Sequence, residues 1–291
     1  MLTLSLVELG ERRDRRYHRT ADSRVHNEAQ ALAFVNEIGF CFLFHDQETE
    51  IPTFIGAISG CRRDYLNDHY DADIGRAWEW KDSLPVRGEI YYGKQLRSKP
   101  TLISLELLPC FYALTPNYGE LDDYLQEYAE GTFTQDAKAV YEALLLHGAQ
   151  PTTHLRRLAG LGGGGAIARR FERAITELQV GMKIVKVGIS DVSRWGYAYV
   201  YDLFLRRFPD VPAAARAFSR DWAMEIILLR HLQNVIADSE PGLKRLFRWE
   251  NWEWSSVIER LRARNALGEI TITETEKVLL TIPDIATSRS S

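Results

Sequence analysis

Cysteine is scarce in this chain: Cys41, Cys61 and Cys110 are the only three among 291 residues. Their odd number and wide spacing exclude a disulfide framework and a zinc ribbon as the basis of the fold. No apolar run approaches the ~20 residues that a membrane-spanning helix needs, and no Gly-Lys-Ser/Thr sequence marks a Walker-type phosphate loop. The N-terminal segment also lacks the charge order of a signal peptide. We therefore expect a cytoplasmic protein with no membrane partner.

The chain has no overall excess of positive charge: its formal net charge is −4. This balance argues against a protein that coats nucleic acid over its whole surface. The cations are nevertheless unevenly distributed. Between Thr152 and Arg216 eleven Lys and Arg residues stand against five Asp and Glu, a local charge near +6, and an acidic stretch over 120–130 precedes them. The charge pattern indicates a basic surface confined to one part of the chain.

That basic part coincides with a recognisable order of secondary structure between Phe133 and Leu203. We expect a helix over 134–146, a short helix opening at 151–152, a glycine-rich turn over 160–165 and a third helix over 166–179. Two strands over 183–187 and 197–201 follow. Helix, turn, helix and a two-stranded wing is the order in which winged helices present their third helix to the DNA major groove.

The same order returns after Ser219, a good N-cap residue. Helices are expected near 221–236, 241–247 and 254–265, and strands over 269–273 and 277–282. The sequence therefore predicts an α+β, mainly helical fold with tandem winged-helix modules. The expected organisation is a flexible basic arm (1–24), an N-terminal module with its own core (25–118), a central winged helix with an acidic lead-in (119–218), a C-terminal winged helix (219–284) and a tail (285–291).

The candidate DNA-binding residues lie in the central winged helix. Arg169, Arg170 and Arg173 fall largely away from the apolar stripe of its third helix, so they suit contacts to phosphates and base edges. The alternative is a solvated face balanced by Glu172 and Glu177. Four further residues are candidates: Arg156 and Arg157 in a supporting position, and Arg194 and Trp195 at the wing tip. The wing-tip pair either enters a minor groove or packs back onto neighbouring tyrosines.

Two motifs partly match binding sites for small ligands, but each lacks a feature that such a site requires. Gly160 to Gly165 satisfies G-x-G-x-x-G, yet a helix rather than a strand precedes it, so we expect a turn and no nucleotide cofactor. Asp68 to Asp73 gathers possible metal ligands at spacings that match no known metal loop, so we expect a polar turn and no metal. The sequence predicts no cofactor.

Three tryptophans, Trp249, Trp252 and Trp254, are densely placed beside Arg245 and Arg248. Aromatic residues at this density commonly anchor a core between helices. The alternative is a platform on which nucleic-acid bases stack. Both interpretations remain open from the sequence.

Several strings of this sequence resemble the AlkZ/YcaQ family of winged-helix DNA glycosylases, and most of all its AlkZ-related branch. They are "LHGAQPTTHLRRLAGL", "RRFERAITELQVGMKIVKVG", "RWGYAYVYDLF", "AMEIILLRHL", "FVNEIGFCFLF" and "WEWKDSLP". The resemblance covers nearly the whole chain. It implies three tandem winged helices around duplex DNA, the first of them built from about residues 25 to 118.

The catalytic residues of that family do not carry over. Its glycosylases use a Gln-x-Asp pair, in which the carboxylate assists the attack of water on the sugar C1′ and the glutamine orients that water. None of the eight glutamines here has an aspartate two positions later, and Gln135-Asp136 is one residue too tight. The family's Trp-His segment is echoed only loosely, by Trp80-Lys81. The catalytic residues are therefore unknown.

Three functional hypotheses follow from the sequence. The leading one is a DNA-binding protein of tandem winged helices, whose partner is duplex DNA and which lacks the family's catalytic pair. The first alternative is an active glycosylase that removes alkylated or crosslinked bases with a different carboxylate. The second is a protein-interaction scaffold with an unknown protein partner.

Overall fold

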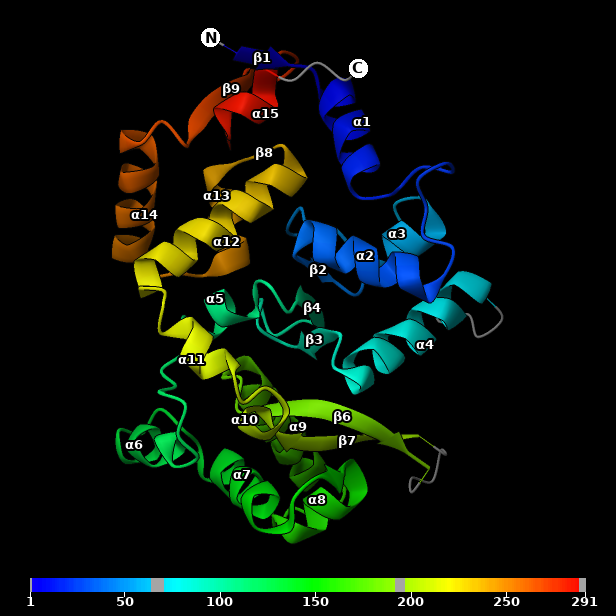
Figure 1. Cartoon of the computed structure of the whole chain (residues 1–291), viewed down its shortest axis with the longest axis vertical. Coiled ribbons are helices and arrows are strands. Elements are labelled where there is room, and N and C mark those ends of the chain that lie inside the picture. Colours follow the sequence, from blue (N-terminus) through cyan, green and yellow to red (C-terminus); the bar gives the residue numbers. More distant parts are fainter. Residues whose placement is uncertain (1, 64–70, 192–196, 288–291) are drawn as a thin grey trace.

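The computed structural model describes residues 2–63, 71–191 and 197–287, and its fold is α+β and mainly helical (Figure 1). The described residues form three small sheets, each surrounded by its own helices. We call the three assemblies unit 1 (28–104), unit 2 (135–203) and unit 3 (220–281). The two chain ends lie together beside unit 3, and unit 2 occupies the opposite end of the molecule. No helix among the described residues is long and apolar enough to cross a membrane.

Unit 1 has the order helix, strand, helix, helix, strand, strand in its described part. The elements are α2 (Glu28–Ile38), β2 (Phe40–Phe42), α3 (Phe54–Ser59), α4 (Ala72–Arg87), β3 (Ile90–Gly93) and β4 (Thr101–Ser104). Strand β4 lies between β2 and β3 and is antiparallel to both. Helix α4 begins at Asp71, whose carboxylate accepts hydrogen bonds from the backbone N–H groups of Asp73 and Ile74. Residues 68–70 of the expected polar turn lie outside the described residues.

Unit 2 repeats this order. Its elements are α7 (Gln135–His147), β5 (Gln150–Pro151), α8 (Thr152–Leu158), α9 (Ala166–Val180), β6 (Ile184–Ser190) and β7 (Ala198–Leu203). The central strand is again the last one, because β7 pairs with both β5 and β6. The expected helices and strands of 133–203 are confirmed with shifts of up to three residues at their ends.

Unit 3 has the same order for a third time. Its elements are α12 (Arg220–Val235), β8 (Ala237–Asp238), α13 (Glu240–Phe247), α14 (Asn251–Ala263), β9 (Gly268–Ile272) and β10 (Val278–Thr281). Strand β10 lies between β8 and β9. Helix α12 begins at Ser219, whose hydroxyl accepts a hydrogen bond from the Trp222 N–H, as its N-cap character predicts. A short helix, α15 (Pro283–Thr287), follows.

The expectation of a flexible arm over residues 1–24 is wrong for the described part. Strand β1 (Leu2–Leu4) pairs in parallel with β9 of unit 3, and helix α1 (Leu6–Arg16) packs against α12. The arginines that suggested a solvated arm are instead held by the protein: Arg13 donates to the carbonyl oxygens of Val235 and Ala237. Because Leu4, Leu9 and Tyr17 are buried, the hydrophobic effect holds this segment in place.

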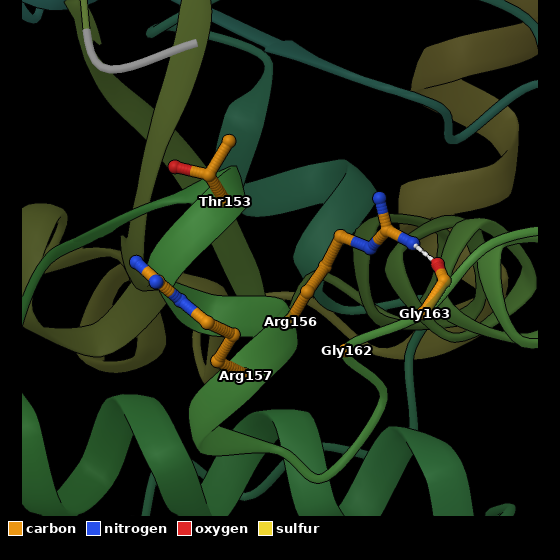
Figure 2. Close-up of a pocket in the computed structure, with 5 residues that line it drawn as sticks. All are labelled: Thr153, Arg156, Arg157, Gly162 and Gly163. Atoms are coloured by element: carbon orange, nitrogen blue, oxygen red, sulfur yellow. Dashed lines mark hydrogen bonds between the residues drawn. The ribbon is translucent and has the colours of Figure 1, made fainter. Parts of the chain in front are cut away.

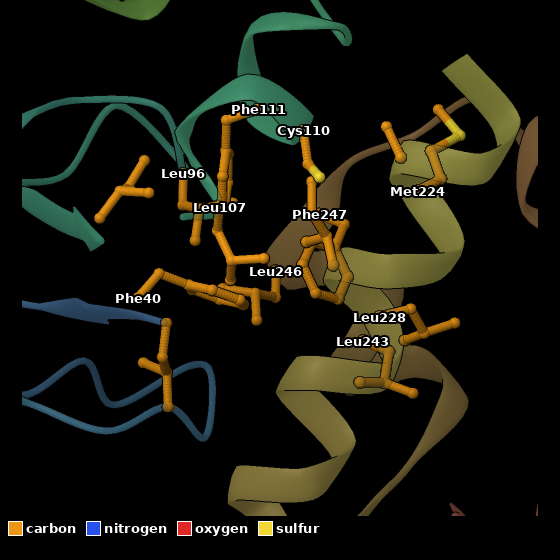
Figure 3. Close-up of a cluster of buried hydrophobic side chains, with 14 of the residues drawn as sticks. Phe40, Leu96, Leu107, Cys110, Phe111, Met224, Leu228, Leu243, Leu246 and Phe247 are labelled. Carbon is orange, nitrogen blue, oxygen red and sulfur yellow. The ribbon is translucent and has the colours of Figure 1, made fainter. Parts of the chain in front are cut away.

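Short helices connect the units. They are α5 (Leu108–Tyr112) and α6 (Asp123–Ala129) between units 1 and 2, and α10 (Phe204–Arg207) and α11 (Val211–Ala215) between units 2 and 3. A shared core joins units 1 and 3: Phe40, Leu107 and Phe111 pack toward Leu246 and Phe247 (Figure 3). Unit 2 has a separate core around Tyr141, Phe171 and Leu178. Units 1 and 3 are thus one packed body, to which unit 2 is attached through β6 and the linkers.

Candidate nucleic-acid interface

The third helix of unit 2, α9, has one apolar side and one cationic side. Phe171, Ala174, Ile175 and Leu178 recur at helical spacing and are buried. Arg169 and Arg173 lie one turn apart on the opposite face, and both are exposed. Neither guanidinium group forms a hydrogen bond or ion pair with another residue in the part of the chain that the structure describes. Two unneutralised cations therefore face solvent from this helix.

Arg170, between them in sequence, is placed differently. Its Nε and Nη2 atoms donate to the Asp136 carboxylate of α7 at 2.8 and 2.6 Å, although the side chain remains 55% exposed. This pair lowers the pKa of the Asp136 carboxyl group through its hydrogen bonds from Arg170. The Gln135-Asp136 sequence therefore contributes its carboxylate to an ion pair between α7 and α9.

The neighbouring glutamates do not neutralise Arg169 and Arg173. The Glu177 carboxylate accepts hydrogen bonds from the Thr134 backbone N–H at 2.8 Å and from the Thr134 hydroxyl at 2.7 Å, so it fastens the start of α7. Glu172 lies near Lys94 of unit 1, where its charge opposes the lowering of the Lys94 pKa by burial. Within the described residues, neither glutamate therefore forms an ion pair with Arg169 or Arg173.

Arg156 and Arg157 belong to α8 and line an open hollow of about 480 Å³ together with Thr153, Gly162 and Gly163 (Figure 2). Arg156 reaches across the glycine-rich turn and donates to the Gly163 carbonyl oxygen, and its guanidinium carbon lies 5.5 Å from the centre of the Phe171 ring. Arg157 is exposed and points away from Arg156. Arg156 thus braces the turn, whereas Arg157 offers its charge to solvent.

The glycine-rich turn itself connects α8 to α9, as the sequence predicts. Gly160 and Gly165 have φ angles of 70° and 55°, in the left-handed region that favours glycine. Gly165 stands at the N-cap of α9 and provides no side chain there, so the first amides of this helix carry no side-chain cap. The wing-tip candidates Arg194 and Trp195 lie outside the described residues.

A buried polar cluster that the sequence did not predict lies where unit 1 meets the β6–β7 hairpin of unit 2. The Lys81 ammonium group of α4 is 2.6 Å from Asp82 Oδ1, 2.8 Å from Tyr199 Oη and 3.2 Å from Tyr197 Oη. Asp82 Oδ2 in turn accepts a hydrogen bond from Tyr197 at 2.5 Å. The Lys81 side chain has no exposed area. Its two tyrosine partners lie 116 and 118 residues away in sequence, so only the folded chain brings them to Lys81.

Aromatic rings complete this cluster. Lys81 Nζ lies 4.1 Å from the centre of the Trp78 ring, and Lys186 Nζ lies 3.8 and 3.9 Å from the centres of Tyr92 and Tyr199. Burial lowers the pKa of Lys81 to about 8 against the opposing charge of Asp82, and it lowers the pKa of Lys186 well below its ordinary value. The alternation of aromatic and charged residues over 78–82 was the available sequence signal.

The three tryptophans of unit 3 differ in how deeply they are buried. Trp254 is buried and its indole N–H donates to Glu240, so it anchors the core. Trp249 is half-buried and stacks on Phe247 with ring centres 4.6 Å apart, while Trp252 is 68% exposed. No group of three or more metal-ligating side chains occurs within the described ranges.

Comparison with known proteins supports this architecture. The structure of the DNA glycosylase AlkZ from Streptomyces sahachiroi superposes with a TM-score of 0.61 at 12% sequence identity, over 99% of this chain and 73% of that chain. At this identity the similarity shows a shared fold. No curated protein matches the chain. The family model described as "AlkZ related" matches residues 25–248, well over half of the sequence. The chain therefore belongs to the AlkZ-related family.

Proposed function

We propose that this protein binds duplex DNA through tandem winged-helix modules. The threefold repeat of helix, strand, helix, helix, strand, strand supports this assignment, as does the common placement of the last strand at the centre of each sheet. The proposed modules are 25–118, 119–218 and 219–284. Their third helices are α4, α9 and α14, the position from which winged helices contact DNA.

The observation that carries the proposal is the unneutralised cationic face of α9. Arg169 and Arg173 are exposed without a protein partner among the described residues, and Arg157 projects from the adjacent helix. The third helices of units 1 and 3 are less suited to this role. Lys81 of α4 is buried in the cluster with Asp82, and Arg260 of α14 is bound to Asp221 and Glu225. DNA contact therefore centres on unit 2.

A binding measurement with substituted arginines tests this proposal. Replacing Arg169, Arg170 and Arg173 together by Ala should abolish most of the affinity for a short paired duplex at low salt. The control is Arg87→Ala, which removes an exposed arginine already paired with Glu28 and Glu89. Absence of measurable duplex binding by the wild-type protein at low salt, or equal binding by the triple variant, would refute the proposal.

A second candidate function is cleavage of the N-glycosidic bond of a damaged nucleotide, and the observation that favours it is the Asp82 carboxylate. This group is held between the Lys81 ammonium group and the Tyr197 hydroxyl, as a catalytic carboxylate is held when its orientation matters. Incubation with alkylated or crosslinked DNA should then yield abasic sites, and Asp82→Asn should lower that yield at least ~100-fold. Absence of abasic sites across a broad lesion panel contradicts this second candidate and leaves duplex binding as the function.

A further inference from the structure

Two open hollows lie along α8 of unit 2, and Arg157 lines both of them. The first, of about 480 Å³, is the hollow beside the glycine-rich turn (Figure 2). The second, of about 400 Å³, is lined by His147 of α7, Gln150 of β5, and His154, Arg157 and Leu158 of α8. We call the second one the histidine hollow. Because they share Arg157, a ligand that runs along α8 meets both hollows.

The glycine-rich turn holds Arg157 in place and adds free donors beside it. A Cβ atom at Gly162 would lie only 3.3 Å from Arg157 Cγ, so the arginine stem rests against the bare turn. The Gly160 N–H donates to the Arg157 carbonyl oxygen at 3.1 Å and ties the turn to the end of α8. Within the described residues, the Arg157 guanidinium group and the N–H groups of Gly162 and Gly163 form no hydrogen bond. The first hollow therefore offers donors and one positive charge.

The histidine hollow offers more groups of the same kind. His147 is exposed and His154 is half-buried, and neither imidazole forms a hydrogen bond or ion pair in the part of the chain that the structure describes. Gln150 Nε2 donates to the His147 carbonyl oxygen at 3.0 Å and so fixes the wall between α7 and β5. No carboxylate belongs to the described lining. An anion is the ligand that this lining fits.

Charged groups on the surrounding elements already have other partners. Asp202 of β7 accepts a hydrogen bond from Arg206 of α10 at 2.9 Å. Arg206 also donates to two backbone carbonyl oxygens at the end of α7. Glu142 of α7 accepts a hydrogen bond from the Tyr124 hydroxyl at 3.0 Å, on the side of the helix that faces α6. These partners hold both carboxylates away from the two imidazoles.

The ends of two helices act on the imidazoles in opposite directions. His147 is the last residue of α7, where the helix dipole favours a cation. His154 lies in the first turn of α8, where the dipole disfavours a cation. A phosphate bound between the two rings attracts both of them in their charged form. Protonation and phosphate binding therefore strengthen each other.

We infer that the histidine hollow holds a backbone phosphate of the bound duplex, and that His147 and His154 bind it in their protonated form. The inference rests on the proposed duplex binding and adds a phosphate site whose strength depends on pH. In helix-turn-helix proteins the helix before the recognition helix crosses the DNA backbone, which is the position of α8. Histidine is the side chain that gains its charge between about pH 8 and pH 5. The arginines hold the duplex throughout this range, and the histidines add to them at its acid end.

The test measures binding of a paired duplex by fluorescence anisotropy at pH 8 and pH 6, each over a series of salt concentrations. The wild-type protein should bind about tenfold more tightly at pH 6, the effect of one charge-assisted hydrogen bond. The magnitude of the slope of log K against log salt should also rise by about two, one for each imidazole that contacts the phosphate backbone. Circular dichroism at both pH values checks that the protein is folded.

Variants then locate the effect. The double variant His147→Gln with His154→Gln keeps a side-chain N–H donor at both positions but cannot become charged. It should bind the duplex at pH 8 as the wild type does, and it should lose the rise in affinity and slope at pH 6. The matched control is His26→Gln, which removes an exposed histidine of the segment before α2 and should keep the wild-type pH dependence.

Inorganic phosphate distinguishes a DNA phosphate from a free ion as the ligand. At pH 6 and equal ionic strength, phosphate and chloride should weaken duplex binding by the wild type to the same extent, because both act by screening. A much stronger effect of phosphate that the double histidine variant lacks would assign the hollow to the free ion and overturn the inference.

The remaining outcomes separate this inference from the proposed function. Equal affinity and equal slope of the wild type at pH 8 and pH 6 overturn the inference and leave duplex binding intact. A pH dependence that persists in the double histidine variant also overturns it. Failure of the wild type to bind the duplex at either pH refutes duplex binding itself and the inference with it.

Discussion

Lys81 Nζ lies 2.6 Å from Oδ1 of Asp82, its neighbour in sequence, and both side chains are enclosed between α4 of unit 1 and the β6–β7 hairpin of unit 2. The pair is linked to Tyr197 and Tyr199, so it connects unit 1 to the β6–β7 hairpin of unit 2. A buried ion pair adds little net stability because desolvation offsets the attraction between its charges, but removal of one partner leaves an uncompensated buried charge.

Removing only the ammonium group should therefore be costly. Lys81→Met leaves the Asp82 carboxylate buried without its charged partner, and we expect the free energy of unfolding to fall by about 3–5 kcal/mol in urea denaturation. The double variant Lys81→Met with Asp82→Asn removes both charges and should recover part of this loss. Equal unfolding midpoints for the single and double variants would show that the two charges are not coupled.

The burial of the Lys81 ammonium group should also make the free energy of unfolding depend on pH. The pKa of Lys81 is about 8 in the folded protein against an ordinary value of 10.5, so the folded state binds fewer protons than the unfolded state between these pH values. The free energy of unfolding of the wild type should then rise with pH in this window, by about 2 kcal/mol from pH 8 to pH 10 relative to Lys81→Met. Parallel urea curves for the two proteins at both pH values would contradict this assignment.

His231 should make the free energy of unfolding depend on pH at the acid end of the range. It is fully buried between Phe40 and Phe247, and burial lowers its pKa from 6.5 to about 3. The unfolded state binds the extra proton first, so stability is complete above pH 6.5 and is lost as pH falls toward 3. The wild type should lose about 2–3 kcal/mol between pH 6.5 and 4.5 relative to His231→Phe.

The comparison of the wild type with His231→Phe also cancels the contribution of Asp238 to the pH dependence of stability. Burial raises the pKa of Asp238 to about 6, so its effect runs in the opposite direction, lowering stability as pH rises from 3.8 through 6. That carboxyl group is present in both proteins and cancels in their difference. An acid-unfolding profile of His231→Phe that coincides with that of the wild type would exclude His231 as the cause of acid sensitivity.

The N-terminal segment packs against unit 3, and substitutions in β1 should show how much this contact contributes to stability. Leu4 is 3% exposed, packs with Ile270 and Ile272, and pairs with Ile272 across the parallel β1–β9 register. Leu4→Ala should lower the free energy of unfolding by about 2–4 kcal/mol, whereas Leu2→Ala, at a 37% exposed position, serves as the matched control with a small effect. Equal thermal midpoints for Leu4→Ala and the wild type would instead support the expectation of a flexible arm over residues 1–24.

Much of the local structure was predictable because it depends on neighbours in sequence. The third helix of unit 2 follows from the spacing of Phe171, Ile175 and Leu178, and the start of α12 follows from Ser219. Helix α4 was not predicted, since its aromatic residues follow no clear period and Pro85 stands in its last turn. The arm was misjudged because its arginines read as solvated, whereas several of them bind backbone carbonyl oxygens of unit 3 or carboxylates.

The candidate site was predictable only in part. Patterning placed Arg169, Arg170 and Arg173 on the outer side of one helix, but nothing in the sequence indicates that Asp136 holds Arg170 and leaves the other two exposed. The buried cluster of Lys81, Asp82, Tyr197 and Tyr199 depends on contacts between units 1 and 2. Such contacts are set by tertiary packing, which no local pattern records.

The salt dependence of duplex binding tests the central claim most directly. Each phosphate contact that is lost reduces the slope of log K against log salt by about one. We predict that the double variant Arg169→Ala with Arg173→Ala reduces the magnitude of this slope by about two. Its affinity for the duplex at low salt should also fall. Arg170→Ala should change the slope far less, because Asp136 already holds that guanidinium group. A slope that is the same for the wild type and the double variant, or a larger loss in Arg170→Ala, would contradict DNA binding through the unpaired arginines of α9.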